Sequence, residues 1–284
     1  MRKNIAQSTY SQSATPHSRA RRGLVKSWTV RTTTLTLLHN YYATPTRLLR
    51  IYHATHLHIH HRPLTHTMNI EQARFNMIEQ QIRTWDVLDQ EVLDLLTVVK
   101  RETFVPSAYT ALAFVDTEIP LPCGQSMMMP KFEARILQEA AVKKHEQVLE
   151  IGAGSGYMAA LLGRCARHVI SIDIEPQLAA LAQENLAASR IDNVDVLVGD
   201  GAYGWAANAP YDVIVVSGSM PLLPAEFLQQ IKIGGRLLCV IGSAPVMTAQ
   251  CITRVSEAGF NTVNLFETAI KPLRNAQTPS RFSF

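Results

Sequence analysis

The middle of the chain carries the stretch Val148-Leu149-Glu150-Ile151-Gly152-Ala153-Gly154-Ser155-Gly156-Tyr157, an apolar run that breaks into three glycines and then resumes as an apolar helical pattern. This pattern predicts a strand, a tight turn and the start of a helix. Gly152, Gly154 and Gly156 let the backbone take positive φ and approach a ligand closely, and the first free N–H groups of the helix face the same space. The stretch therefore predicts a nucleotide-binding turn.

The glycine spacing and the preceding acid indicate which nucleotide binds. The third glycine, Gly156, comes one residue too early for the dinucleotide pattern G-x-G-x-x-G. Glu150 stands just before the turn, where a carboxylate repels a pyrophosphate but suits a ligand with an ammonium group and a sulfonium group. These features favour S-adenosylmethionine, and the plain alternative is an ordinary strand-to-helix turn.

Two further acids follow predicted strands downstream of the turn. Asp173 ends the strand 169–173, about 20 residues after the glycines, where a ribose-binding carboxylate belongs. Asp200 follows the strand 194–198 and is expected to reach the adenine amine. An acid at a strand end is often only a turn former, but these acids follow successive strands. The predicted cofactor-binding set is Glu150, Gly152, Gly154, Gly156, Asp173, Asp200 and Gly201.

Strand and helix patterns alternate through the second half of the chain, which predicts an α/β fold with a doubly wound, mostly parallel sheet. Two alternating segments, 247–255 and 262–268, flank Glu257-Ala258-Gly259 and predict an antiparallel hairpin at the sheet edge. The predicted strands are 147–151, 169–173, 194–198, 211–217 and 235–241, and the predicted helices are 156–166, 176–189 and 224–231, the last ended by Gly234-Gly235.

Two amphipathic helices and an irregular loop are predicted ahead of this core. Apolar residues recur at helical spacing over 70–82 and again over 92–99, where Asp89 is the expected N-cap. The proline-bounded segment 119–130 contains three methionines and is expected to form no regular element. It either folds over the cofactor as a substrate lid or is an apolar connector whose methionines fill gaps.

The first 67 of the 284 residues differ in composition from the rest. They contain 10 Lys/Arg, 8 of the 10 His and no acid, so residues 68–284 hold 17 Lys/Arg against 23 Asp/Glu, a net charge of −6. A transit peptide, a nucleic-acid-binding arm and translation from a misplaced start codon are the alternatives, and the last is favoured. The expected organisation is an extension over 1–67, a helical cover with the substrate loop over 68–146 and the cofactor-binding core over 147–284, with 68–284 forming one compact domain.

Several site classes are disfavoured by the sequence. The histidine-rich run 53–61 has no acid or cysteine nearby to complete a metal site, and the four cysteines lack CxxC spacing and are interpreted as reduced core residues. No metal site is therefore predicted. No membrane-spanning segment is predicted either. The net charge of −6 over residues 68–284 disfavours nucleic-acid binding. A cytoplasmic monomer is expected.

Several short pieces along the chain together match one protein family. They are Phe104-Val105-Pro106, Pro120 to Gln125, Val148 to Tyr157, Gly199-Asp200-Gly201, Gly204-Trp205, Ala209 to Val216, Pro224, Gly234-Gly235 and Pro272-Leu273. Through these pieces, residues 70–273 resemble the protein-L-isoaspartate O-methyltransferases. The resemblance implies a seven-stranded methyltransferase sheet and methylation of the α-carboxyl of isoaspartyl residues in damaged proteins, with S-adenosylmethionine as cofactor.

Two stretches depart from the family pattern. The family usually has Thr-Ile-Ser-Gln-Pro where this chain has Ser126-Met127-Met128-Met129-Pro130, and the resemblance assigns the first hydroxyl, Ser126, to the methyl-acceptor side. Met128 replaces the second hydroxyl. The stretch 217–219, Ser-Gly-Ser, replaces Thr-Ala-Ala, and its hydroxyls either face the substrate or cap the strand. A different acceptor, or cofactor binding without turnover, therefore remains the alternative function.

Overall fold

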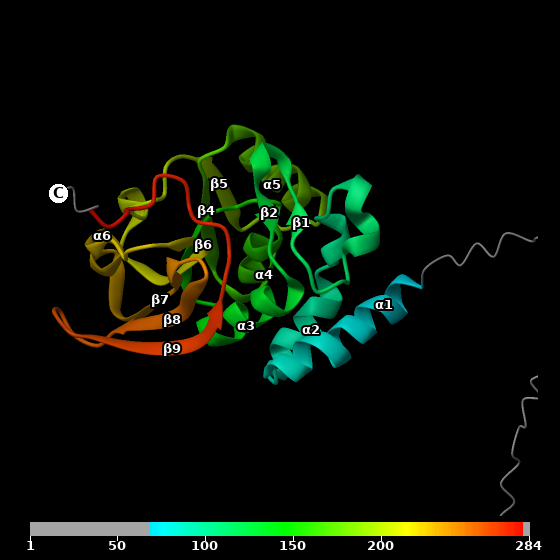
Figure 1. The fold of residues 1–284 in the computed structure, drawn as a ribbon, viewed down its shortest axis with the longest axis horizontal. Coiled ribbons are helices and arrows are strands. Elements are labelled where there is room, and N and C mark those ends of the chain that lie inside the picture. The colour runs from blue at the N-terminus through cyan, green and yellow to red at the C-terminus, as the bar shows by residue number, and fades with distance from the viewer. Residues whose placement is uncertain (1–68, 281–284) are drawn as a thin grey trace, which may run out of the picture. The chain divides into compact units, whose positions relative to one another are not determined.

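The computed structural model describes residues 69–280, which belong to one compact unit, Thr65–Phe284. A seven-stranded sheet in the order β5-β4-β3-β6-β7-β8-β9 forms its centre (Figure 1). The boundary predicted at residue 68 stays a prediction, and the histidine-rich run lies outside the described residues. The strands are β3 (Gln147–Ile151), β4 (His168–Asp173), β5 (Val194–Val198), β6 (Tyr211–Met220), β7 (Ile231–Ser243), β8 (Val246–Arg254) and β9 (Phe260–Thr268).

The first five strands in this order pair in parallel, and β8 and β9 add two antiparallel pairings. The predicted mostly parallel sheet and the predicted C-terminal hairpin are therefore confirmed. The sequence order reverses between β4 and β6 on either side of β3. Open α/β sheets bind ligands at such a reversal, beyond the carboxyl ends of the strands.

Side chains of the central strands alternate between two cores, as strand geometry requires. In β3, Val148 packs in the larger core and Leu149 in the smaller one. The larger core joins the sheet to five helices, and the smaller one joins it to α6 and the C-terminal segment. The helices are α1 (Ile70–Met77), α2 (Gln90–Val98), α3 (Pro130–Ala140), α4 (Tyr157–Cys165), α5 (Pro176–Ala188) and α6 (Ala225–Gln229).

The N-terminal helical cover is confirmed in its elements. Asp89 caps α2 by accepting the amide N–H of Glu91 at 2.9 Å, as the sequence predicts. Asn69 caps α1 in the same way through the amide of Gln72. Within residues 69–280 no helix combines the length and apolarity that crossing a membrane requires.

Two predictions of secondary structure were wrong. The segment 119–130 does contain regular structure, because β1 (Ile119–Pro120) pairs with β2 (Ser126–Met127) in an antiparallel ribbon, with Ile119 and Met127 buried. The predicted helix over 224–231 ends at Gln229, and Gly234-Gly235 lies inside β7. There the pairing partners jump from Tyr211 and Ile231 to Val213 and Arg236, so the glycines form a bulge and end no helix.

All four cysteines are free thiols, but only Cys239 is fully buried. Cys123 lies in the turn Pro122–Gly124 between β1 and β2, with φ of +58°. The interpretation of the cysteines as core residues was therefore wrong for Cys123, because this turn lies on the surface.

A buried ion pair fixes the methionine-containing segment to the helical cover. Arg101 is 1% exposed and pairs with Glu133 of α3, which is 2% exposed. Its guanidinium also donates to the carbonyls of Ala113 at 3.0 Å and Met128 at 2.6 Å. Burial raises the pKa of Glu133 to about 7, although Arg101 opposes the shift. One side chain therefore positions the backbone at Met128.

We predict that Arg101→Met lowers the free energy of unfolding by about 3–5 kcal/mol at pH values above the pKa of Glu133, because it leaves a buried carboxylate without its partner. Urea denaturation measures this change. Arg83→Met is the control, since Arg83 pairs with Glu79 on the surface, and such pairs contribute at most about 1 kcal/mol. Equal losses in the two variants would contradict the prediction.

Candidate active site

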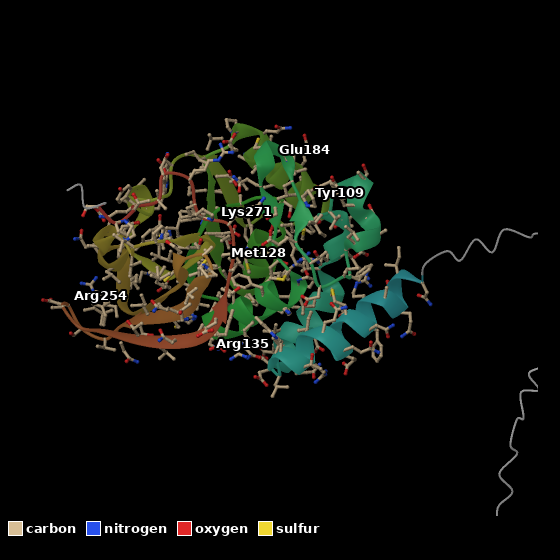
Figure 2. The ribbon with its side chains drawn as sticks, in the orientation of Figure 1. Tyr109, Met128, Arg135, Glu184, Arg254 and Lys271 are labelled. Carbon is tan, nitrogen blue, oxygen red and sulfur yellow. The ribbon has the colours of Figure 1, made fainter. Side chains whose placement is uncertain are left out.

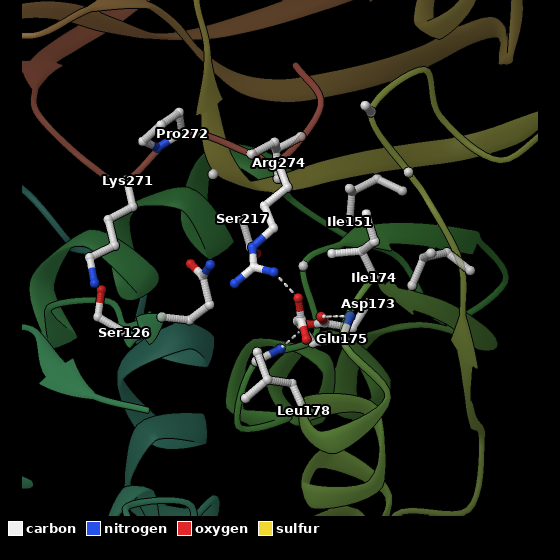
Figure 3. A pocket seen from close by; sticks show the side chains of 18 of the residues that line it. Ser126, Ile151, Asp173, Ile174, Glu175, Leu178, Ser217, Lys271, Pro272 and Arg274 are labelled. Carbon is white, nitrogen blue, oxygen red and sulfur yellow. Dashed lines mark hydrogen bonds and ion pairs between the residues drawn. The ribbon is translucent and has the colours of Figure 1, made fainter. Parts of the chain in front are cut away.

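A pocket lies beyond the carboxyl ends of the central strands, where the sheet order reverses (Figure 3). The space between its lining residues is about 780 Å³, part of which is open to solvent. Five of the seven predicted cofactor-binding residues line it, and the acceptor-side residue Ser126 lines it too. These residues are Gly152, Gly154, Asp173, Asp200, Gly201 and Ser126.

The glycine turn takes the predicted backbone conformation. Gly152 has φ of +96° and Gly154 has φ of +54°, values that side chains rarely allow. The amide of Gly154 donates to Asp173 Oδ2 at 2.9 Å, while Asp173 Oδ1 accepts the amide of Glu175 at 3.0 Å. Burial raises the pKa of Asp173, although the bond from Gly154 opposes the shift. One carboxylate therefore both holds the turn and faces the pocket.

Asp200 closes the same edge of the pocket from the segment after β5. Its Oδ1 accepts the amide of Ala202 at 3.0 Å, and its Oδ2 accepts the side-chain amide of Asn275 at 2.8 Å. A Cβ atom on Gly201 would lie 2.7 Å from the side chain of Ile151. The absence of a side chain at Gly201 therefore lets this segment approach β3.

Glu150 lies below the glycine turn and is fully buried. The hydroxyls of Ser171 and Ser217 donate to it at 2.5 and 3.3 Å. Burial raises its pKa to about 8, and the two serine hydroxyls oppose the shift. Glu150 faces a smaller cavity of about 290 Å³. That cavity shares Ser126, Met128, Gly152, Gly154 and Ser217 with the larger pocket.

Gly156 is the predicted residue that lines neither cavity. It precedes α4 with φ of +84°, and a Cβ there would lie 3.1 Å from the backbone of Ala182 in α5. The packing of α4 against α5 therefore explains why this position has no side chain.

The predicted acceptor side is formed by the ribbon β1–β2 and by β6. The Ser126 hydroxyl donates to Glu118 Oε2 at 2.6 Å, and Met128 lines both cavities. Ser217 also lines them, whereas Ser219 is buried and donates to the carbonyl of Ile270 at 3.1 Å. Of the two serines in 217–219, Ser217 therefore lines the pocket and Ser219 binds the C-terminal segment.

The sequence analysis missed the C-terminal strap, defined here as residues 270–275. The strap pairs with Ser219 through backbone bonds of 2.9 Å to Lys271 and Leu273. It brings Lys271 and Arg274 into the pocket, and Arg274 pairs with Glu175, another missed residue (Figure 3). The signal in the sequence is that both basic residues flank Pro272-Leu273, a piece that resembles the family.

The residues present fit S-adenosylmethionine. Positive-φ glycines leave the pocket floor open to a close ligand, and acidic side chains at neighbouring strand ends suit ribose hydroxyls, an adenine amine and a cationic centre. The pocket also opens toward Ser126 and Met128 on the other side. This arrangement can hold a cofactor beside an acceptor. Residues 69–280 contain no cluster of three or more metal-binding side chains.

Comparison with known proteins agrees with this geometry. The sequence model described as protein-L-isoaspartate(D-aspartate) O-methyltransferase matches residues 72–275. A protein-L-isoaspartate O-methyltransferase of Koribacter versatilis is 36% identical over 210 residues, which cover 73% of this chain and 94% of that protein. One of Protochlamydia amoebophila is 40% identical over 179 residues, which cover 63% of this chain and 84% of that protein.

Solved structures show the same fold. A protein-L-isoaspartate O-methyltransferase superposes with a TM-score of 0.63 at 23% identity, covering 74% of this chain and 67% of the other. A putative member from Plasmodium falciparum, solved in complex with S-adenosyl-L-homocysteine, gives 0.60 at 18% identity, covering 72% and 97%. The extent of the sequence match, together with the glycine turn and the strand-end acids around one pocket, places this chain in the protein-L-isoaspartate(D-aspartate) O-methyltransferase family.

Proposed function

We propose that the protein transfers the methyl group of S-adenosylmethionine to the α-carboxyl group of L-isoaspartyl residues in damaged proteins. The observation that supports this most directly is one pocket lined by two groups of residues from different parts of the fold. Gly152, Gly154, Asp173 and Asp200 lie at or just after the ends of β3, β4 and β5, and Ser126 and Met128 belong to the ribbon β1–β2 and the segment that follows it. The family membership supplies the reaction, and the methyl ester formed then collapses to a succinimide.

On the cofactor side, each proposed role follows from the chemistry of the residue. Asp173 accepts the ribose hydroxyls, and Asp200 accepts the adenine amine. Gly152, Gly154 and Gly201 let the backbone approach the ligand, while Gly156 fixes the start of α4. Glu150 faces the ammonium group from the smaller cavity, and its raised pKa of about 8 means that an adjacent cation is needed to favour its charged form at neutral pH.

On the acceptor side, no general base is required. S-adenosylmethionine, when bound, supplies a methyl group on a positively charged sulfur. A substrate carboxylate is already ionised at neutral pH, so the protein has to orient its oxygen in line and exclude water. Ser126 lies on this side of the pocket. Arg101 fixes the backbone at Met128 beside it.

The same proposal covers partners and location. The acceptors are damaged proteins or peptides bound as extended segments, with no nucleic acid and no membrane partner. The net charge of −6 over residues 68–284 supports the first exclusion. The protein is proposed to act as a cytoplasmic monomer, with residues 68–146 as cover and substrate loop and 147–284 as cofactor-binding core.

The direct test is methylation of an isoaspartyl peptide with labelled S-adenosylmethionine, beside the same peptide with normal aspartate. We expect base-labile methyl ester on the isoaspartyl peptide only. Absence of that ester would reject the repair function. Calorimetric binding of the cofactor in the same preparation would then favour a different acceptor or a binding protein without turnover.

We predict that Asp173→Ala weakens binding of S-adenosylhomocysteine by about 10- to 150-fold, because hydrogen bonds to a charged group contribute roughly 1.5–3 kcal/mol. Isothermal titration calorimetry measures the affinity. Asp195→Ala is the control, since Asp195 is an exposed acid of the neighbouring strand that pairs with His168. An unchanged affinity in Asp173→Ala would rule out its role in binding the cofactor.

We also predict a pH-dependent stability difference for Glu150→Gln without cofactor. Burial raises the folded pKa of Glu150 from 4.5 to about 8, so the folded protein keeps a proton that the unfolded chain releases between these values. The wild type therefore loses stability across this window as the pH rises, and glutamine does not. Urea unfolding at several pH values is expected to show Glu150→Gln gaining a few kcal/mol over the wild type.

The matched control for this measurement is Glu257→Gln, which removes an acid from the exposed turn between β8 and β9. Its stability relative to the wild type is expected to stay the same over that window. A pH-independent difference for Glu150→Gln would show that Glu150 is ionised in the folded protein.

A further inference from the structure

Lys271 brings an ammonium group to the acceptor side of the pocket. Its side chain extends from the C-terminal strap in the direction of Ser126 (Figure 3), and both residues line the pocket. Lys271 and Met128, both labelled in Figure 2, line the same pocket. The ammonium donates to the carbonyl of Gly124 at 2.8 Å, two residues before Ser126.

The two cations among the described pocket residues differ in their partners. Arg274 pairs with Glu175 and donates to the carbonyl of Cys123 at 2.8 Å. Lys271 is exposed, and none of the ion pairs formed within residues 69–280 includes it. An ammonium has three donor hydrogens, so Lys271 keeps donors available for a ligand and Arg274 is already committed to holding the strap.

The hydroxyl expected to bind the acceptor is engaged elsewhere. A carboxylate can only accept hydrogen bonds, so the single hydroxyl proton of Ser126 points to Glu118 at 2.6 Å. Met128 has no donor in its side chain. A substrate carboxylate at this side would therefore face the charge of Glu118, with no hydroxyl proton to offset it. The side chain that can supply the missing positive charge is Lys271.

We propose that Lys271 binds the α-carboxylate of the acceptor and makes the site select an anionic acceptor. This inference rests on the function proposed above and assigns its substrate-binding cation. The ion pair is strongest before reaction, because the carboxylate loses its negative charge as its oxygen forms the bond to the methyl group and the sulfonium leaves as a neutral thioether. Lys271 therefore lowers KM and does not raise kcat.

The test compares two peptides and two variants in the full chain. One peptide carries an isoaspartyl residue, and the other carries its α-carboxamide, which has the same shape but no charge. Lys271→Met removes the ammonium. Lys144→Met is the matched control, since Lys144 is also exposed and also donates to a single backbone carbonyl, that of Arg164, but it precedes β3 and lies outside the pocket.

Lys271→Met is expected to raise KM for the isoaspartyl peptide about tenfold, between the effect of an exposed ion pair and that of a desolvated one, with kcat unchanged or higher. Inhibition by the carboxamide peptide and affinity for S-adenosylhomocysteine are expected to stay the same. Lys144→Met is expected to match the wild type in all four measurements.

Two results would overturn the inference while leaving the methylation activity intact. One is an unchanged KM in Lys271→Met, and the other is equal weakening of the carboxylate and carboxamide peptides. Failure of the wild type itself to methylate the isoaspartyl peptide would instead reject the proposed function, so the two failures are distinguishable.

Discussion

The hydrogen bond from the Gly154 amide to the carboxylate of Asp173 is the contact on which the site depends. It joins the turn after β3 to the end of β4, and the same carboxylate fixes the amide of Glu175 at the start of the next helix. The turn can donate this bond because its glycines adopt positive φ. One hydrogen bond therefore positions both the glycine turn and Asp173, which line the pocket together.

The opposite side of the pocket is built differently, from segments that depend on one another. The ribbon β1–β2 has only two residues per strand, too few to be stable alone. Arg101 donates a hydrogen bond to the carbonyl of Met128, the residue that follows β2. Lys271 and Arg274 of the C-terminal strap donate to carbonyls in the turn between β1 and β2. The conformation of the ribbon therefore depends on both the helical cover and the strap.

Buried acids give the site its electrostatic character. Glu133 and Glu150 both have raised pKa values, because burial opposes their charged forms. Glu133 has a cation beside it in Arg101, whereas Glu150 has serine hydroxyls. A fixed guanidinium keeps the first acid as part of the scaffold, while the second is free to respond to a cationic group in the cavity.

The sequence by itself determined the parallel core, the C-terminal hairpin, the glycine turn and the acids at Asp173 and Asp200, because each follows from a periodicity or spacing within a few tens of residues. Only the tertiary structure decided which groups line the proposed acceptor side of the pocket. Lys271 meets Gly124 across 147 positions, and Arg274 meets Cys123 across 151, distances at which no local pattern relates the partners. The sequence also could not predict which residues are buried. The pKa of Glu150 and the role of Gly156 depend on the neighbours that pack around them.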